Sequence, residues 1–387
     1  MAKVLLCPSA FYPSLGGVEE VCRNLGRQLQ AQGFEVAVAV NRHPSTLPEI
    51  EEVDGLPVHR FPLEYPNRSL QGIITAAKIP LHLGKFLSFV RSYAPDILHV
   101  ICPSSTALYC RSVQEALGTK VVVTLSGELF MDANELYQRS AFARHWLSQL
   151  LFSADAVTSC SQYVMDDAKA RFHFSSGIER VIFNGIDLTE QPSPCKRTIL
   201  NRPFVFGAGR LVRNKGFDWL LRSFKLLAED SEVDLVLAGD GPAKLELEAL
   251  ARTLQIDGRV HFVGRQDRAS IASLFEKCLF FVLPSPVEPF GIVCLEAMRA
   301  GKPIISANTG GPVEFIGDAG LFVPPLDVES LYEVMKQLCS DSDLLRQLGA
   351  NAKTNVQSFD WTTIVDHYIE IYRALTTSAI KAEACVS

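Results

Sequence analysis

Two glutamates bracket a junction between a loop and a helix in the second half of the chain. Glu288 lies in a segment with three prolines between residues 284 and 289, and these prolines exclude a regular strand or helix there. Apolar residues at helical spacing begin at Ile292 and place Glu296 inside the helix. The first amides of a helix are unpaired and suit a phosphate. Here they belong to Phe290, Gly291 and Ile292.

Carboxylates repel a phosphate, because both are negatively charged. Two glutamates beside a phosphate site are therefore better suited to bind neutral groups of the same ligand. A sugar nucleotide offers such groups, because it carries neutral sugar and ribose hydroxyls as well as a diphosphate. We therefore expect Glu288 to bind sugar hydroxyls, Glu296 to bind the ribose diol and the amides to bind the diphosphate. The alternative is an ordinary αβ unit with a solvated Glu288 and a surface Glu296.

Two cations follow the first strand of the same half. That strand, residues 204–207, leads into Gly209-Arg210-Leu211 and then Lys215-Gly216. A diphosphate would collect positive charge at this crossing from strand to helix, since arginine can fork onto two phosphate oxygens and lysine acts as a mobile point charge. The alternative is a pair of solvated surface cations.

Further ligand contacts are expected where other strands end. Gly16-Gly17 separates a strand at residues 3–7 from a helix at residues 18–32, so a backbone could approach a diphosphate there. Strands at residues 234–238 and 260–263 end where we expect the nucleotide base, at Gly239, Val263, Gly264 and Arg265. The turn at Gly16-Gly17 lacks the G-x-G-x-x-G spacing of dinucleotide sites, which gives a dehydrogenase little support.

Taken together, these strings resemble the donor site of family-4-type retaining glycosyltransferases of the GT-B fold, the glycosyl transferases group 1. The matching strings are E-P-F-G-x-x-x-L-E-A-M-x-x-G-x-P at 288–303, G-R-L-x-x-x-K-G at 209–216, G-G-V-E at 16–19 and N-G-I-D at 184–187. The resemblance covers essentially the full chain, and its most specific strings lie in the second half. It implies a nucleotide-sugar donor, with UDP favoured, and transfer with retention at the anomeric carbon.

One position departs from the family pattern. Many family members end the strand that corresponds to residues 120–124 in a histidine that contacts the transferred sugar, and Ser126 stands at that position here. The departure puts the identity of the sugar and the acceptor contacts in doubt, although a hydroxyl can still bind a sugar. Glu128 is either an acceptor-side carboxylate or a cap for a helix near residues 133–137.

The order of elements predicts an α/β protein. With the resemblance, it indicates a GT-B fold with two doubly wound, Rossmann-like parallel-sheet domains facing across a cleft, and a C-terminal helix that crosses back to the first domain. The expected boundaries are residues 1–188 for the acceptor-side domain, 189–203 for a linker, 204–358 for the donor-binding domain, 359–376 for the helix and 377–387 for a tail.

Composition narrows the function classes. The net charge of −6 gives no general basic field for nucleic acid, and ten scattered cysteines without metal-ligand spacing favour a reducing compartment. We expect no cofactor and no metal, because no D-x-D pair is placed like a metal site. A cytoplasmic location is expected. The apolar helix at residues 70–93 is either a surface helix with charges in water or a peripheral contact with a membrane or lipid-linked acceptor.

The sequence therefore predicts a metal-independent retaining glycosyltransferase of glycan biosynthesis, with a glycan, lipid-linked or small-molecule acceptor. Its expected catalytic residues are Glu288, Arg210, Lys215 and Ser126. Rival hypotheses are a GT-B-like sugar-nucleotide epimerase, a phosphorylase, or a non-catalytic scaffold that keeps the nucleotide pocket. Ser126 is the feature that favours the scaffold.

Overall fold

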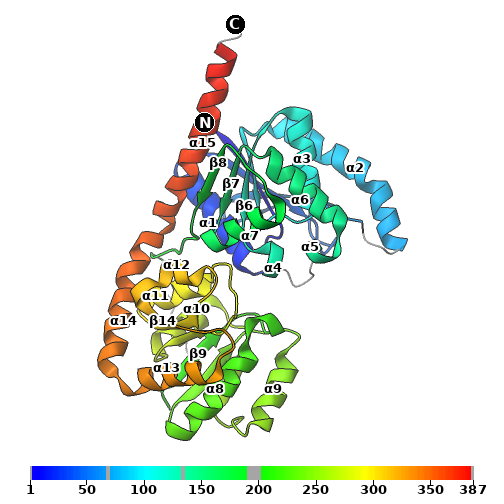
Figure 1. Ribbon diagram of the computed structural model, residues 1–387. Helices are drawn as coiled ribbons and strands as arrows, with labels where there is room; N and C mark the ends of the chain where they lie inside the picture. The colour runs from blue at the N-terminus through cyan, green and yellow to red at the C-terminus, as the bar shows by residue number, and fades with distance from the viewer. Residues whose placement is uncertain (1, 67–69, 132–135, 190–201, 385–387) are drawn as a thin grey trace. The chain divides into compact units, whose positions relative to one another are not determined.

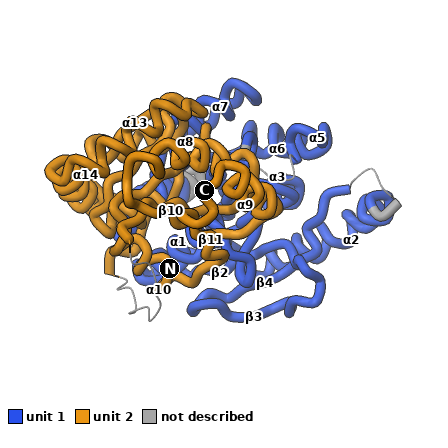
Figure 2. Tube along the Cα trace, turned by 90° about the horizontal axis from the view of Figure 1, so that it is seen from below, with its two compact units in different colours: residues 1–184, 361–387 blue, residues 185–360 orange. Residues whose placement is uncertain are grey.

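The computed structural model describes residues 2–66, 70–131, 136–189 and 202–384, and Figure 1 gives the order of the elements. The chain divides into two compact units (Figure 2): unit 1 comprises Met1–Asn184 and Trp361–Ser387, and unit 2 comprises Gly185–Asp360. Most of the predicted linker, residues 190–201, lies outside the described residues.

Unit 1 is built on an eight-stranded sheet in the order β3-β4-β2-β1-β5-β6-β7-β8. All neighbouring strands are parallel except β3, which pairs antiparallel with β4. The inner strands are nearly continuous runs of buried Val, Ile and Leu, as expected for a parallel sheet covered on both faces. The strands are β1 (Lys3–Pro8), β2 (Glu35–Asn41), β3 (Ile50–Val53), β4 (Leu56–Phe61), β5 (Ile97–Ile101), β6 (Lys120–Leu125), β7 (Ala156–Ser159) and β8 (Ile178–Val181).

The helices of unit 1 bury one face each against this sheet or against a neighbouring helix. In α1, for example, the buried residues Val21, Leu25 and Leu29 recur every four positions. The helices are α1 (Gly17–Ala31), α2 (Leu70–Tyr93), α3 (Thr106–Leu117), α4 (Glu128–Met131), α5 (Leu136–Arg139), α6 (Ala141–Ser153), α7 (Gln162–Phe172) and α15 (Trp361–Ala384).

Unit 2 is built on a six-stranded, fully parallel sheet in the order β11-β10-β9-β12-β13-β14. Its strands are β9 (Phe204–Ala208), β10 (Asp234–Ala238), β11 (Val260–Gly264), β12 (Phe281–Leu283), β13 (Ile304–Ala307) and β14 (Gly320–Val323). Its α-helices are α8 (Phe217–Asp230), α9 (Lys244–Thr253), α10 (Arg268–Lys277), α11 (Ile292–Arg299), α12 (Pro312–Ile316), α13 (Val328–Ser340) and α14 (Ser342–Asn355). The prediction of two doubly wound α/β domains is confirmed.

The structure also differs from the sequence-based expectations in three elements. The sequence analysis had no strand at β3, although Asp54-Gly55, both with positive φ, form the tight turn that joins β3 to β4. A proline inside a helix normally interrupts it, but α2 continues through Pro80, because Pro80 is exposed and water can replace the lost backbone hydrogen bond. Helix α15 reaches Ala384 rather than ending at residue 376, so it includes residues that were expected to form a tail.

A buried polar network ties α15 to the sheet of unit 1. His99, fully buried on β5, lies 2.7 Å from the Tyr372 hydroxyl through Nδ1 and 2.6 Å from Thr124 Oγ1 through Nε2. Thr124 in turn lies 2.6 Å from Thr158 Oγ1 on β7. Burial lowers the pKa of His99 to about 3, so the ring is neutral. The stability that this neutral ring contributes is present above the ordinary histidine pKa of about 6.5 and falls as the pH drops toward 3.

Replacing Tyr372 with phenylalanine should lower the free energy of unfolding by about 1–3 kcal/mol, because His99 Nδ1 then loses its partner in a buried position. Urea denaturation at pH 7 measures the change. Tyr93→Phe is the matched control, since that hydroxyl makes only contacts of 3.3 and 3.5 Å to backbone oxygens. Equal losses in the two variants would show that the network does not hold α15.

Candidate functional site

Four loops meet at the carboxyl ends of adjacent strands in unit 2. They follow β9 (residues 209–216), β10 (239–243), β12 (284–291) and β13 (308–311). Backbone hydrogen bonds join them: Leu211 N donates to Asp240 O at 2.9 Å, and Gly311 N donates to Glu288 O at 2.9 Å. In an open parallel sheet this edge is where ligands bind.

Two glycines allow the loops to touch through their backbones. A Cβ atom on Gly239 would lie 1.8 Å from Gly209 O, and a Cβ atom on Gly216 would lie 2.1 Å from Pro284 O. Both glycines also have positive φ, at 138° and 68°. Side chains on these loops are therefore held at fixed separations by backbone packing.

The loop after β13 also belongs to this edge, although its residues were not among the predicted site residues. Thr309 Oγ1 donates to Pro286 O at 2.6 Å, and a Cβ atom on Gly310 would lie 2.5 Å from Glu288 O. The string Thr309-Gly310-Gly311-Pro312 directly after a buried strand was the available signal, because such glycines permit close backbone approach.

Lys215 and Glu288 form an ion pair across two of these loops. Lys215 Nζ lies 2.6 Å from Glu288 Oε2, and the two side chains are 19% and 10% exposed. The pair brings together a cation that the sequence assigned to a diphosphate and a carboxylate that it assigned to sugar hydroxyls. In this state each charge neutralises the other in a partly desolvated position.

The backbone amides of Gly291 and Ile292 lie at the start of α11, beside this ion pair. Gly291 is the N-cap residue with φ of 83°, and no side chain of the described residues caps the turn. The preceding residue, Phe290, is buried and stacks on Phe315 with ring centroids 4.3 Å apart, which fixes the entry to the helix. Predicted amide donors from Gly291 and Ile292 therefore lie at a helix N-terminus, where the helix dipole favours an anion.

The buried thiol of Cys294 lies among the charged residues of the site. Burial raises the pKa of Cys294, and the charges of Glu288 and Glu296 raise it further while Lys215 opposes them. The thiol is therefore neutral and a poor nucleophile. Glu296 is half-buried on α11. The charges of both predicted glutamates and of Lys215 all act on the Cys294 thiol.

The remaining predicted residues of unit 2 lie at the same edge of the sheet. Arg210 is exposed directly after β9. Gly239 N donates to Gly264 O at 2.9 Å, which joins the loops after β10 and β11. Val263 O accepts a hydrogen bond from Gln266 Nε2 at 2.5 Å, and Arg265 is exposed.

The predicted residues of unit 1 form a separate set. Gly16 is the N-cap of α1, and Glu19 folds back over it, so that a Cβ atom on Gly16 would lie 2.8 Å from Glu19 Oε2. Gly17 begins α1. Ser126 follows β6 and is half-buried. The glycines therefore permit a carboxylate, Glu19, to lie close over the backbone of this turn.

Glu128 is a buried carboxyl group beside Ser126. Its Oε2 accepts a hydrogen bond from Ser126 N, two positions earlier in the chain, at 2.7 Å. Part of the helix near residues 133–137 that Glu128 was predicted to cap lies outside the described residues. Its Oε1 is buried and has no hydrogen-bond partner in the described part of the chain. Burial raises the pKa of Glu128 to about 7.

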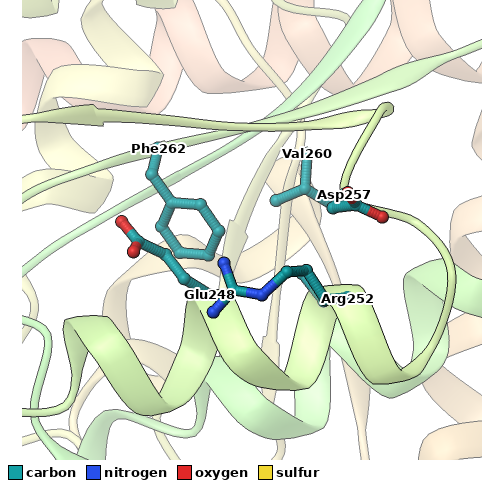
Figure 3. A pocket seen from close by; sticks show the side chains of 6 residues that line it. Glu248, Arg252, Asp257, Val260 and Phe262 are labelled. Carbon is teal, nitrogen blue, oxygen red and sulfur yellow. The ribbon is translucent and has the colours of Figure 1, made fainter.

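Two surface hollows of unit 2 lie away from these loops. Figure 3 shows the smaller one, of about 160 Å³, between α9 and β11; its lining residues include Glu248, Arg252 and Phe262. That volume is below the range of about 300–1,000 Å³ that is usual for ligand pockets. A larger hollow of about 440 Å³ lies beside α14 at the amino ends of β12 and β13, with Lys302 and Lys353 in its lining. Among the described residues, no group of three or more His, Cys, Asp or Glu is placed to hold a metal ion.

Comparisons with known proteins match both halves of the chain. Residues 15–190 match the model of Glycosyltransferase Family 4, and residues 195–355 match that of Glycosyl transferases group 1. An uncharacterized glycosyltransferase of Methanocaldococcus jannaschii is 26% identical over 93% of this chain and 94% of its own length.

Solved structures share the fold at low sequence identity. Sucrose-phosphate synthase from Thermosynechococcus elongatus is similar with a TM-score of 0.82 and 24% identity over 98% of this chain and all of that chain. An Anabaena protein in complex with UDP and glucose is similar with a TM-score of 0.76 and 22% identity over 96% and 99% of the two chains.

The raised pKa of Glu128 predicts a pH-dependent penalty on the native state. The native state favours the protonated carboxyl, so the stability from this group is present below pH 4.5 and is lost as the pH rises through about 7. Glu128→Gln should therefore raise the free energy of unfolding at pH 8 by about 3 kcal/mol and change it little at pH 4.5. Urea denaturation of both proteins at the two pH values measures this. A variant less stable than the native protein at pH 8 would contradict the assignment.

Proposed function

Because the chain belongs to the glycosyltransferases, family 4 in its N-terminal half and group 1 in its C-terminal half, we propose that it moves a sugar from a nucleotide-diphosphate sugar to a hydroxyl acceptor. The fold is GT-B. The observation that supports the donor class is the edge of unit 2, where Lys215, a helix N-terminus and two carboxylates lie close together. Arg210 is exposed in the loop after β9 at the same edge.

We assign the diphosphate to the amides at the start of α11 together with Arg210 and Lys215. A diphosphate carries more negative charge than one carboxylate, so it can compete with Glu288 for the ammonium group of Lys215. Glu288 is then released to accept hydrogen bonds from sugar hydroxyls, and Glu296 binds the ribose. In this proposal the ion pair holds two ligand-binding groups in place before the donor binds.

Uracil is the proposed base of the donor nucleotide. The similarity to an Anabaena protein that binds UDP supports it. The base would lie against the backbone of Val263, Gly264 and Arg265. The side chain of Gln266 donates a hydrogen bond to the Val263 carbonyl there.

The proposed chemistry is a transfer with retention. The acceptor oxygen bonds to the anomeric carbon, the bond from that carbon to the diphosphate oxygen breaks, and the acceptor proton passes to the leaving phosphate. Arg210, Lys215 and the α11 amides stabilise the charge that develops on the diphosphate. These groups supply the positive charge that a metal would otherwise contribute, so we propose a metal-independent reaction.

A non-catalytic scaffold is the second candidate, and Ser126 in place of the family's histidine favours it.

The acceptor in the catalytic proposal is a glycan, a lipid-linked sugar or a small molecule. We also propose a reducing, cytoplasmic setting, which the ten scattered cysteines without metal-ligand spacing in the sequence support.

A thermal-shift panel with UDP, GDP, ADP and NAD tests the donor site. A nucleotide at about 100 times its Kd stabilises the protein by about 2.7 kcal/mol, and we expect a shift of several degrees with UDP. Arg210→Ala should weaken UDP binding at least about tenfold, because it removes a charge-assisted contact. Arg213→Ala is the matched control from the same loop, since Arg213 pairs with Glu246 instead. A shift with NAD alone would overturn the proposal.

Replacing Glu288 separates an enzyme from a scaffold. Glu288→Gln removes a charge beside the proposed sugar and should lower kcat for sugar transfer by about 100-fold or more. Glu246 is an exposed carboxylate of the same unit, and Glu246→Gln should leave kcat unchanged. The assay measures release of UDP from UDP-sugars with candidate acceptors.

The same assay with and without EDTA tests metal independence, and activity should survive EDTA. Loss of activity in EDTA that added Mg²⁺ restores would contradict metal independence.

A further inference from the structure

The outward face of α2 is apolar although it faces solvent. Ile73 is 66% exposed, Leu81 is 61% exposed, and Ile74, Ala77 and Pro80 are also exposed. In the described part of the chain, α2 alone is long and apolar enough to cross a membrane, and only 22% of the relevant window is buried. An exposed helix of a globular protein normally turns a polar face to water.

The two faces of α2 are separated by helical spacing. Phe86 and Val90 are fully buried and fix the C-terminal half of the helix to unit 1, where Phe86 also meets Phe61 and Tyr109. Ile73, Ala77, Leu81 and Gly84 recur every three or four residues and lie on the opposite side. Both views show the N-terminal end of α2 projecting from the edge of unit 1 (Figures 1 and 2).

Positive charge flanks this apolar face. Lys78 and Lys85 lie seven residues apart on one side of it, and both are exposed. No Asp or Glu occurs between Glu64 and Asp96. The protein as a whole has a net charge of −6, whereas this acid-free segment carries positive charge.

A second acid-free segment continues the surface. Phe142, exposed at the start of α6, packs edge-on against Tyr65, which precedes α2, with ring centroids 5.5 Å apart. No Asp or Glu occurs between Glu135 and Asp155, a stretch that includes Arg144. Aromatic and basic side chains together are typical of the interface between a membrane and water.

These features fit a helix that lies on a membrane and not one that crosses it. A crossing helix would have to withdraw Phe86 and Val90 from unit 1 and carry Lys78 and Lys85 into hydrocarbon, which is costly. A helix in the interface keeps the packed face on the protein, inserts Ile73, Ile74 and Leu81 among the acyl chains and leaves the lysines at the headgroups.

We propose that the outward face of α2, continued by Phe142, docks unit 1 on a membrane with anionic headgroups. The surface goes beyond the proposed function, because it needs neither the nucleotide nor the acceptor. It would place unit 1 where lipid-linked acceptors are found. If the catalytic proposal holds, on which this step rests, the membrane surface favours a lipid-linked acceptor over a soluble one.

The test is co-sedimentation of the full chain with vesicles of phosphatidylcholine alone or mixed with phosphatidylglycerol. The native protein should bind the mixed vesicles, and binding should weaken as salt is raised. Two variants should each weaken that binding at least about tenfold: Ile73→Ser with Ile74→Ser and Leu81→Ser, and Lys78→Glu with Lys85→Glu. Controls on unit 2 carry the same changes at exposed positions: Leu245→Ser with Leu326→Ser, and Arg346→Glu with Lys353→Glu.

Several outcomes overturn the proposal. It fails if the native protein binds neither vesicle, or if the unit 2 controls weaken binding as much as the α2 variants. It also fails if light scattering shows a dimer that the serine variant abolishes while vesicle binding is absent, because a second copy then covers the face. UDP binding is measured in parallel: a protein that binds UDP but no vesicle refutes only the membrane surface, and one that binds vesicles but no nucleotide refutes only the donor site.

Discussion

The ion pair between Lys215 and Glu288 is the interaction on which the site of unit 2 depends. It joins the loop after β9 to the loop after β12, and at 2.6 Å it holds two opposite charges in a partly buried position. Removing either partner would leave the other charge uncompensated, so the pair and the loop geometry support each other. In the proposed function, a ligand with a stronger anion and with hydroxyl groups would separate the two side chains. Binding and structure therefore use the same two side chains.

Backbone contact between glycine-containing loops gives that ion pair its fixed setting. Gly239 and Gly216 bring carbonyl groups of neighbouring loops closer than any side chain would permit, and Gly310 does the same for the backbone of Glu288. The loops therefore act as one rigid edge, with the N-terminus of α11 opening beside it. Preorganised amides of this kind stabilise a developing negative charge without reorganising during the reaction.

The sequence predicted the family, the two parallel-sheet domains and the residues of unit 2 that meet at one edge, because strand periodicity and glycine strings act over short distances. It did not predict that Lys215 pairs with Glu288, since 73 positions separate them and only the fold brings them together. Thr309 and Gly310 were not assigned to the site, although their string directly after a predicted strand was an available signal. The buried His99 network was also missed, because one polar residue in an apolar strand does not reveal its partner on a helix 273 positions away. The roles assigned to all the predicted catalytic and donor-binding residues, Lys215 and Glu288 included, stay predictions.

The most direct measurement is a crystal structure of the protein with UDP. The account predicts a diphosphate within hydrogen-bond distance of the Gly291 and Ile292 amides, with Lys215 Nζ moved from Glu288 onto a phosphate oxygen and the uracil near Val263. A nucleotide bound in the basic hollow beside α14, with the Lys215–Glu288 pair intact at 2.6 Å, would contradict it.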